Sequence, residues 1–252
     1  MPSPRTQRSF SLIGNSGPTE RTLTKKEIIM QKFATPAAIV TVLDIPAGLI
    51  RLAASDRTDT TVDVRPANAA KGADVKAAEQ ITVEYGDGVL RITAAPAKNR
   101  ILGDSGSVEV TVQLPAGSRV EAKTAAGELR GTGRLGDVTF EGAQGTVTLD
   151  ETANARLALL AGDITVGRLG GPAEISTQQG DLRVAEAIRG TVVLRTESGA
   201  ISVDAAPGVS ATLDAGTAYG RIHNALANTE GAAAELSIRA TTSYGDITAR
   251  SL

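Results

Sequence analysis

The sequence contains no cysteine, which excludes disulfides, thiolate metal sites and cysteine nucleophiles. Its only histidine is His223, and no G-x-S-x-G motif is present, so a histidine metal cluster or a Ser-His-Asp triad has little to build on. Aromatic residues make up 2% of the chain and tryptophan is absent, so the rings that stack on sugars or bases are scarce. We therefore predict no catalytic residues, no metal site and no cofactor.

The sequence also lacks any concentration of charge and any long apolar run. Its 26 basic and 28 acidic residues are mixed along the chain and give a formal net charge of -2. Without a Lys/Arg-rich block, nucleic acid is not a predicted partner, and no segment is apolar enough to span a membrane. A length of 252 residues with 41% hydrophobic content predicts one large or two small domains with a sizeable core.

Residues 1–29 are rich in Ser, Thr and Arg and lack the apolar run of a signal peptide. They are predicted to be either a disordered tail or an extension beyond the natural start. The second interpretation rests on Lys26 and Glu27, whose codons AAG-GAG would read as a ribosome-binding site just upstream of Met30. The missing export signal predicts a cytoplasmic protein, with the cell surface as the alternative.

A repeat of about 18 residues begins after residue 118. Each repeat has a glycine followed two positions later by a bulky aliphatic residue, and a strand with alternating apolar residues precedes the glycine. The glycines are Gly127, Gly145, Gly162, Gly180, Gly199, Gly220 and Gly245, and the aliphatic residues are Leu129, Val147, Ile164, Leu182, Ile201, Ile222 and Ile247. Each unit thus reads as strand, turn, strand, turn.

Such a unit cannot bury its own apolar face, but units stacked about 4.8 Å apart would align equivalent residues into continuous rows. The repeat therefore predicts an all-β fold in which residues 119–252 form a solenoid of two-strand coils. Ile164, Leu182 and Ile201 should then share one interior row. An antiparallel meander or sandwich is the alternative, and the repetition of strand pairs rather than single strands favours the solenoid.

Residues 30–118 are strand-rich but do not follow this period, so they are predicted to form an N-terminal, β-sandwich-like domain that covers the first coil. Gly86-Asp87-Gly88 predicts a tight hairpin. The segments Pro46–Gly48 and Pro115–Gly117 predict sharp corners. The segment Ala69–Ala78 is compatible with either a short helix or a loop.

The repeated motif resembles that of a known bacterial family. Ala161–Val166, Gln179–Val184 and Tyr244–Ile247 follow the pattern x-G-D-I/L, and Asp44–Gly48 adds a matching Asp-Ile-Pro-Ala-Gly segment. They are similar to the β-strand-repeat family known as "putative adhesins", of unknown function, and the resemblance extends from residue 30 to 252. It implies a right-handed β-solenoid-like protein with no assigned catalytic residues.

Two columns of side chains beside the repeated glycines are candidate interaction residues. Asp163 and Asp181 would lie on successive coils, where paired carboxylates can bind Ca²⁺ or share a proton, although aspartate after glycine also serves local turn hydrogen bonds. Tyr219 and Tyr244 would be neighbours on the last two coils. They would either cover the end of the core or form a contact patch for a partner.

The predicted function is a non-catalytic structural or protein-interaction module. Its partner would be an unknown protein, or a second copy bound through the edge of the C-terminal coil, because the chain ends at Leu252 soon after its last strand. The segment Asn224–Ala234 could fold over that edge as a short helix. The alternatives are an exported cell-surface adhesin and a carbohydrate-active enzyme of the β-helix type.

Overall fold

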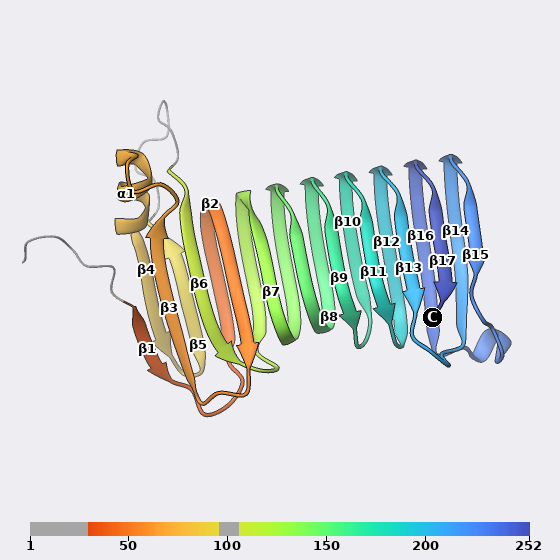
Figure 1. Ribbon diagram of the computed structural model, residues 1–252, viewed down its shortest axis with the longest axis horizontal. Coiled ribbons are helices and arrows are strands. Elements are labelled where there is room, and N and C mark those ends of the chain that lie inside the picture. The colour runs from red at the N-terminus through yellow and green to blue at the C-terminus, as the bar shows by residue number, and fades with distance from the viewer. Residues whose placement is uncertain (1–29, 96–105) are drawn as a thin grey trace, which may run out of the picture.

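The computed structural model describes residues 30–95 and 106–252, and within these ranges the chain forms a rod built almost entirely of strands (Figure 1). All 17 strands belong to one sheet. The two helices are α1 (Gly72–Glu79) and the 3-10 turn η1 (Gly231–Ala233). Neither is long and apolar enough to cross a membrane. The predictions for residues 1–29 fall outside the described ranges.

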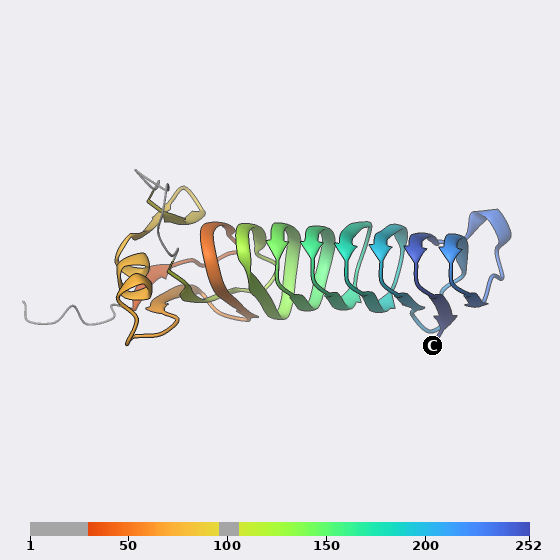
Figure 2. The same cartoon turned by 90° about the horizontal axis from the view of Figure 1, so that it is seen from above.

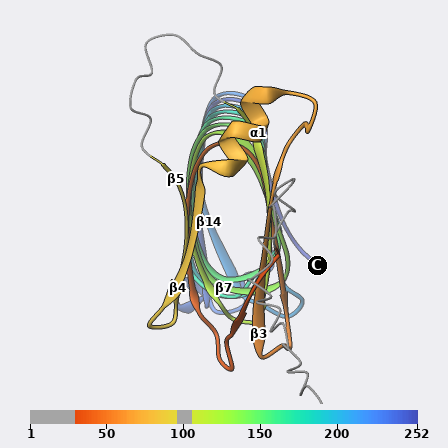
Figure 3. The same cartoon turned by 90° about the vertical axis from the view of Figure 1, so that its left-hand side faces the viewer.

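The rod is a solenoid, because strand pairs stack in parallel with their equivalents one coil away. The strands are β2 (Val40–Ser55), β7 (Arg119–Gln144), β8 (Val147–Ala161), β9 (Ile164–Leu169), β10 (Ala173–Gln179), β11 (Leu182–Ala187), β12 (Gly190–Ser198) and β13 (Ile201–Ala205). β7 and β8 each run through a bend and contribute to two coils. Figure 2 shows the coils side by side from above, and in Figure 3, which looks along the axis, they superimpose as a flattened tube. The all-β solenoid prediction is confirmed.

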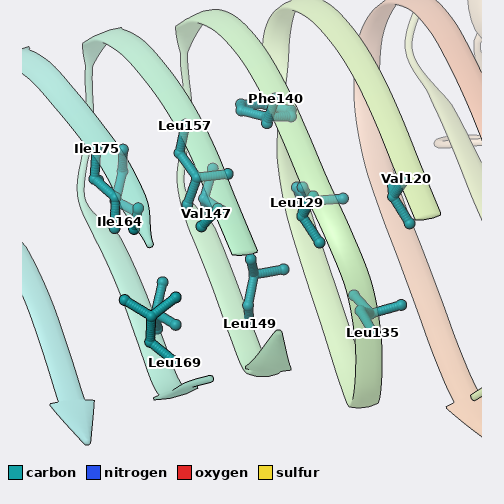
Figure 4. Packing of buried hydrophobic residues seen from close by; sticks show 14 of the residues in the cluster. Val120, Leu129, Leu135, Phe140, Val147, Leu149, Leu157, Ile164, Leu169 and Ile175 are labelled. Atoms are coloured by element: carbon teal, nitrogen blue, oxygen red, sulfur yellow. The ribbon is translucent and has the colours of Figure 1, made fainter. Parts of the chain in front are cut away.

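The core consists of aliphatic rows inside the tube. Leu182 pairs with Ile164 on one side and with Ile201 on the other, and each of the three side chains is 1% exposed. Figure 4 shows the same arrangement in neighbouring coils, where side chains such as Val147 and Leu149 point into the interior. The alternation of the strands buries every second residue, so equivalent apolar residues of successive coils contact one another along the whole rod.

Glycine is required at the bend because successive coils approach one another through their backbones. Gly162 has φ +133°, and a Cβ built on it would overlap the carbonyl oxygen of Gly145 in the preceding coil. The same holds for Gly180 against Gly162 and for Gly199 against Gly180. The repeated glycines therefore set the close spacing of the coils as well as the direction of the turn.

The N-terminal strands extend both faces of the solenoid. They are β1 (Gln31–Ala34), β3 (Asp59–Pro66), β4 (Ile81–Gly86), β5 (Val89–Ala94) and β6 (Val108–Pro115). β2 forms the first coil: it pairs with β7 on one side and with β5 and β6 on the other. Beyond these, β4 pairs antiparallel with β5, and β3 with β6 and β1. The Asp87-Gly88 hairpin forms as predicted, with both residues at positive φ, and α1 forms within the segment that the sequence left open.

At the other end, the order of the coils in space differs from their order in the sequence. The last strands are β14 (Ala211–Tyr219), β15 (Ile222–Ala225), β16 (Leu236–Tyr244) and β17 (Ile247–Ser251). β16 pairs with both β12 and β14, and β17 pairs with both β13 and β15. The C-terminal coil is thus inserted between the β12–β13 coil and the β14–β15 coil, which is outermost (Figure 1).

This order corrects the expectation of an open C-terminal edge. Both sides of β16 and β17 are paired, so neither strand offers an edge to a second copy. The open edge belongs to β14 and β15. The segment Asn224–Ala234, expected as a possible short helix, contains only the single turn η1, and its Ala227 carbonyl accepts a hydrogen bond from the Ala211 N–H at 3.0 Å.

An ion pair and better apolar filling favour the C-terminal coil in the inner position. Arg250 of β17 donates two hydrogen bonds of 2.9 Å to the buried carboxylate of Asp204 on β13. The residue of β15 in register with Arg250 is Ala225, which would leave Asp204 without this partner. In the interior column, Ala249 of β17 is matched by Asn224 of β15, so a polar amide would enter the core if the two coils were exchanged.

Candidate contact surface on the outermost coils

The bend between the two strands of each coil forms a ridge along one side of the rod. The residue before the bend glycine and the residue after it both lie on this ridge, and they form the two columns that the sequence singled out. The C-terminal coil and the outermost coil therefore place Tyr244 next to Tyr219, and Asp246 next to Arg221.

The two tyrosines form a stacked pair on the surface. Their ring centroids are 5.0 Å apart and their planes differ by 3°. Tyr219 is 68% exposed and Tyr244 is 59% exposed, and Ile222, just past the same bend, is 46% exposed. Stacking at close to the coil spacing follows from the register, because Tyr219 and Tyr244 are direct neighbours on parallel strands. Together these three side chains form what we call the distal patch.

The aspartates of the second column are engaged in backbone hydrogen bonds. Asp163 Oδ1 accepts from the Asp181 N–H at 2.8 Å, and Asp181 Oδ1 accepts from the Ala200 N–H at 2.7 Å. Each carboxylate thus links its own coil to the next one through a hydrogen bond. This is the local hydrogen-bonding role that the sequence analysis gave as the alternative to cation binding. In the two described ranges, no three His, Asp or Glu side chains gather in a way that could hold a metal ion.

Asp246 continues this column and adds an ion pair beside the tyrosines. Its Oδ1 accepts from the Arg221 N–H at 2.8 Å, and its Oδ2 lies 3.1 Å from Arg221 Nη2. The backbone hydrogen bond, followed by the guanidinium, lowers the pKa of the Asp246 carboxyl below its usual value. The Arg221 side chain is 88% exposed, so most of its surface is free for other contacts.

The sequence analysis missed a column of threonines three residues before the bend glycines. Each threonine hydroxyl donates a hydrogen bond to the carbonyl of the bend glycine in the preceding coil, at 3.0 to 3.3 Å. The donors are Thr177, Thr196, Thr242 and Thr217. The signal was present in the sequence, since the same residue type recurs at one fixed offset from the glycine. The hydrogen bonds explain why the buried positions Thr177, Thr196 and Thr242 are polar.

His223 lies on β15 with its side chain exposed. It does not lie on the ridge of bend residues. The ridge therefore has a largely polar part along the middle of the rod and two exposed tyrosines at its end. Ile222 lies just past the ridge, in register with the buried Ile247, and is exposed because its coil is the outermost one.

Comparison with known proteins agrees with the fold. The family model described as Toastrack DUF4097 matches residues 74–250. No curated protein matches the chain significantly.

Several solved structures are similar at low identity. A "putative adhesin" from Parabacteroides distasonis ATCC 8503 has 13% identity and a TM-score of 0.46, with 87% of this chain and 96% of that chain covered. A "putative lipid binding protein" from the same organism has 13% identity, a TM-score of 0.44 and the same coverage. A "putative cell adhesion protein" from Clostridium sporogenes ATCC 15579 has 13% identity and a TM-score of 0.39, with 89% and 99% covered.

Proposed function

The chain belongs to the Toastrack DUF4097 family, and within that frame we propose that it is an exported, cell-surface adhesin that binds its target through the distal patch. The solenoid would act as a rigid spacer. This replaces the cytoplasmic interaction module favoured by the sequence with the alternative that the sequence analysis kept open.

One observation carries the proposal, namely where the exposed apolar side chains lie. Tyr219, Ile222 and Tyr244 are 68%, 46% and 59% exposed, and they lie together on the two outermost coils. Large apolar side chains that share one surface patch are a feature of contact sites, and tyrosine is among the residues that carry most binding energy. The N-terminal strands cover the opposite end of the rod (Figure 1), so the distal patch is the end available for contact.

The location can be tested on intact cells. A membrane-impermeant reagent that biotinylates lysines is applied to living cells of the source bacterium, and the chain is then isolated and probed for biotin. The proposal predicts labelling without lysis, because Lys32 and Lys123 have mostly exposed side chains. Labelling that appears only after the cells are broken would contradict an exported protein.

The binding surface can be tested with beads that carry the purified chain. Retention on a layer of intact bacterial cells is expected to fall for the double variant Tyr219→Ala/Tyr244→Ala. Leu160→Ala is the matched control, because Leu160 is 51% exposed but lies on β8 in the middle of the rod. Equal retention of the double variant and the wild type would refute the assignment of the distal patch.

A further inference from the structure

The backbone at the ridge forms a directional ladder of hydrogen bonds. In each coil the bend glycine N–H donates to a carbonyl of the next coil away from the N-terminal strands, at 2.7 to 3.1 Å. The N–H two residues later does the same at 2.9 to 3.0 Å. The final rungs run from Gly245 to the Tyr219 carbonyl and from Ile247 to the Arg221 carbonyl. At each bend the N–H groups of the glycine and of the residue two positions later therefore face outward, and so does the glycine carbonyl, which accepts from the threonine of the next coil.

The outermost coil has the donors but no coil beyond it in the described ranges. β14 pairs with β16 alone and β15 with β17 alone. The N–H groups of Gly220 and Ile222 correspond to those of Gly245 and Ile247, so they point outward from the end of the rod. Strand edges of this kind bind extended polypeptide by adding one more strand.

Other groups at the same bend are also placed to contact one more strand. The Gly245 carbonyl accepts the Thr217 hydroxyl at 3.0 Å, and among the described residues no threonine hydroxyl donates to the equivalent Gly220 carbonyl. Tyr219 stacks on Tyr244 with one ring face, which leaves its other face toward the end of the rod. Arg221 stands where Asp163, Asp181 and Asp246 stand in other coils, so this bend favours an acidic neighbour.

Two other parts of the same edge are less open to a new strand. The N–H of Ala211 at the start of β14 already donates to Ala227, and Asn224 puts an amide in a column that is apolar at Ala249 and Val203. Polar residues directed inward and a covering loop are devices that protect sheet edges from uncontrolled pairing. The bend from about residue 217 to residue 222 is the part of the edge where outward backbone groups, a free ring face and a charged side chain come together.

We propose that this bend binds one extended segment of a partner polypeptide, an inference that rests on the proposed adhesin function. The segment would run parallel to β14. It would contain a threonine, an aromatic residue two positions later and an acidic residue two positions after that. The threonine would donate to the Gly220 carbonyl. The aromatic ring would stack on Tyr219, and the acid would face Arg221. Two carbonyls of the segment would accept from the N–H groups of Gly220 and Ile222.

A second copy of this chain does not fit the same site. In a second copy, the segment with the required pattern, Thr242–Ile247, is paired on both sides by neighbouring coils, so it is not free to add to another rod. The site therefore suits a different polypeptide.

The probe for this inference is a fluorescent synthetic peptide with the sequence of residues 236–247, which contains the required pattern. Exchange with the chain's own β16–β17 is prevented by a Ser202→Cys/Thr248→Cys variant, because these residues are neighbours on β13 and β17. Binding of the peptide to this locked full-length chain is measured by fluorescence anisotropy. Saturable binding is expected, and a peptide in which its tyrosine is alanine should bind about tenfold more weakly.

Variants at the bend identify the site. Ile222→Pro removes the outward N–H and should weaken peptide binding about tenfold, whereas Ile222→Val keeps both that donor and a branched aliphatic side chain and should change binding much less. Arg221→Glu, which does not touch the backbone, should also weaken binding by repelling the peptide's acid. No saturable binding, or equal binding by all three variants, would overturn the inference. Surface labelling of cells without peptide binding would support the proposed function and overturn this inference. Peptide binding without surface labelling would support this inference and overturn the proposed function.

Discussion

Replacing a bend glycine by alanine tests the packing principle of the rod most directly. Gly162 is the best position, because it lies in the middle of the solenoid between Gly145 and Gly180 in the neighbouring coils. Gly208 is a matched control: it also has positive φ, +78°, and lies in a loop between coils, but a Cβ there would have no neighbour within 4 Å. Both substitutions add one methyl group.

The expected costs differ because only one of the two methyl groups has room. At Gly208 the cost is conformational and amounts to about 1–2 kcal/mol for a residue with a side chain in the left-handed region. At Gly162, φ is +133° and a Cβ would lie 1.6 Å from the Gly145 carbonyl oxygen. The conformation alone costs about 1–3 kcal/mol, and the overlap can be relieved only by separating two coils whose hydrogen bonds hold them together. We expect a total loss of more than about 4 kcal/mol, which single substitutions rarely reach.

The measurement is urea unfolding followed by far-UV circular dichroism, with the midpoint compared at an unchanged slope. Gly208→Ala should unfold at a slightly lower urea concentration than the wild type. Gly162→Ala should unfold at a far lower concentration or fail to fold. If both variants lose the same stability, the close approach of the glycine backbones does not set the coil spacing, and the explanation given for the repeat is wrong.

Two further predictions concern the outermost coils. The chain has no cysteine of its own, so an introduced pair can be tested for disulfide formation on a non-reducing gel. Oxidation should give a disulfide in Ser202→Cys/Thr248→Cys but not in Ser202→Cys/His223→Cys, because β17 separates β13 from β15. The reverse result would show that the coils follow sequence order. Arg221→Ala should raise the pKa of Asp246 only part of the way to its usual value, because the backbone N–H remains. Since folding lowers this pKa, the stabilisation is present above the unfolded value and is lost as pH falls through the folded one; an NMR titration showing a fully normal pKa in Arg221→Ala would contradict the backbone as the main cause.

The repeat was predictable because every coil has the same short-range sequence pattern. Each repeat carries its own alternation and its own glycine, so the strands, the bends and the shared row of Ile164, Leu182 and Ile201 follow from short-range pattern alone. The Asp87-Gly88 hairpin was predictable for the same reason. Local signals were sufficient wherever the structure depends on neighbours within one repeat.

The order of the last two coils was not predictable from that rule, because both coils obey it. β14–β15 and β16–β17 have tyrosine, glycine and isoleucine at the same places, so the pattern cannot decide which one lies inside. The decision depends on contacts such as that between Asp204 and Arg250, which lie 46 residues apart in the sequence. The functional meaning of Tyr219 depends on this order, since the sequence indicates that it has a tyrosine neighbour but not that one of its ring faces is directed to the end of the rod.

The exchanged order also explains how one end of the rod can be stable and still bind. If the C-terminal coil were outermost, its fully buried residues Leu236, Ile238 and Ile247 would line an open edge, the kind of surface that promotes uncontrolled strand pairing. The β14–β15 coil carries Asn224 in the row of Ala249 and Val203, so it ends that row with a polar group. What remains open is one bend with fixed donors and a free ring face, and a small rigid edge of this kind selects a partner by its side-chain pattern rather than by its general stickiness.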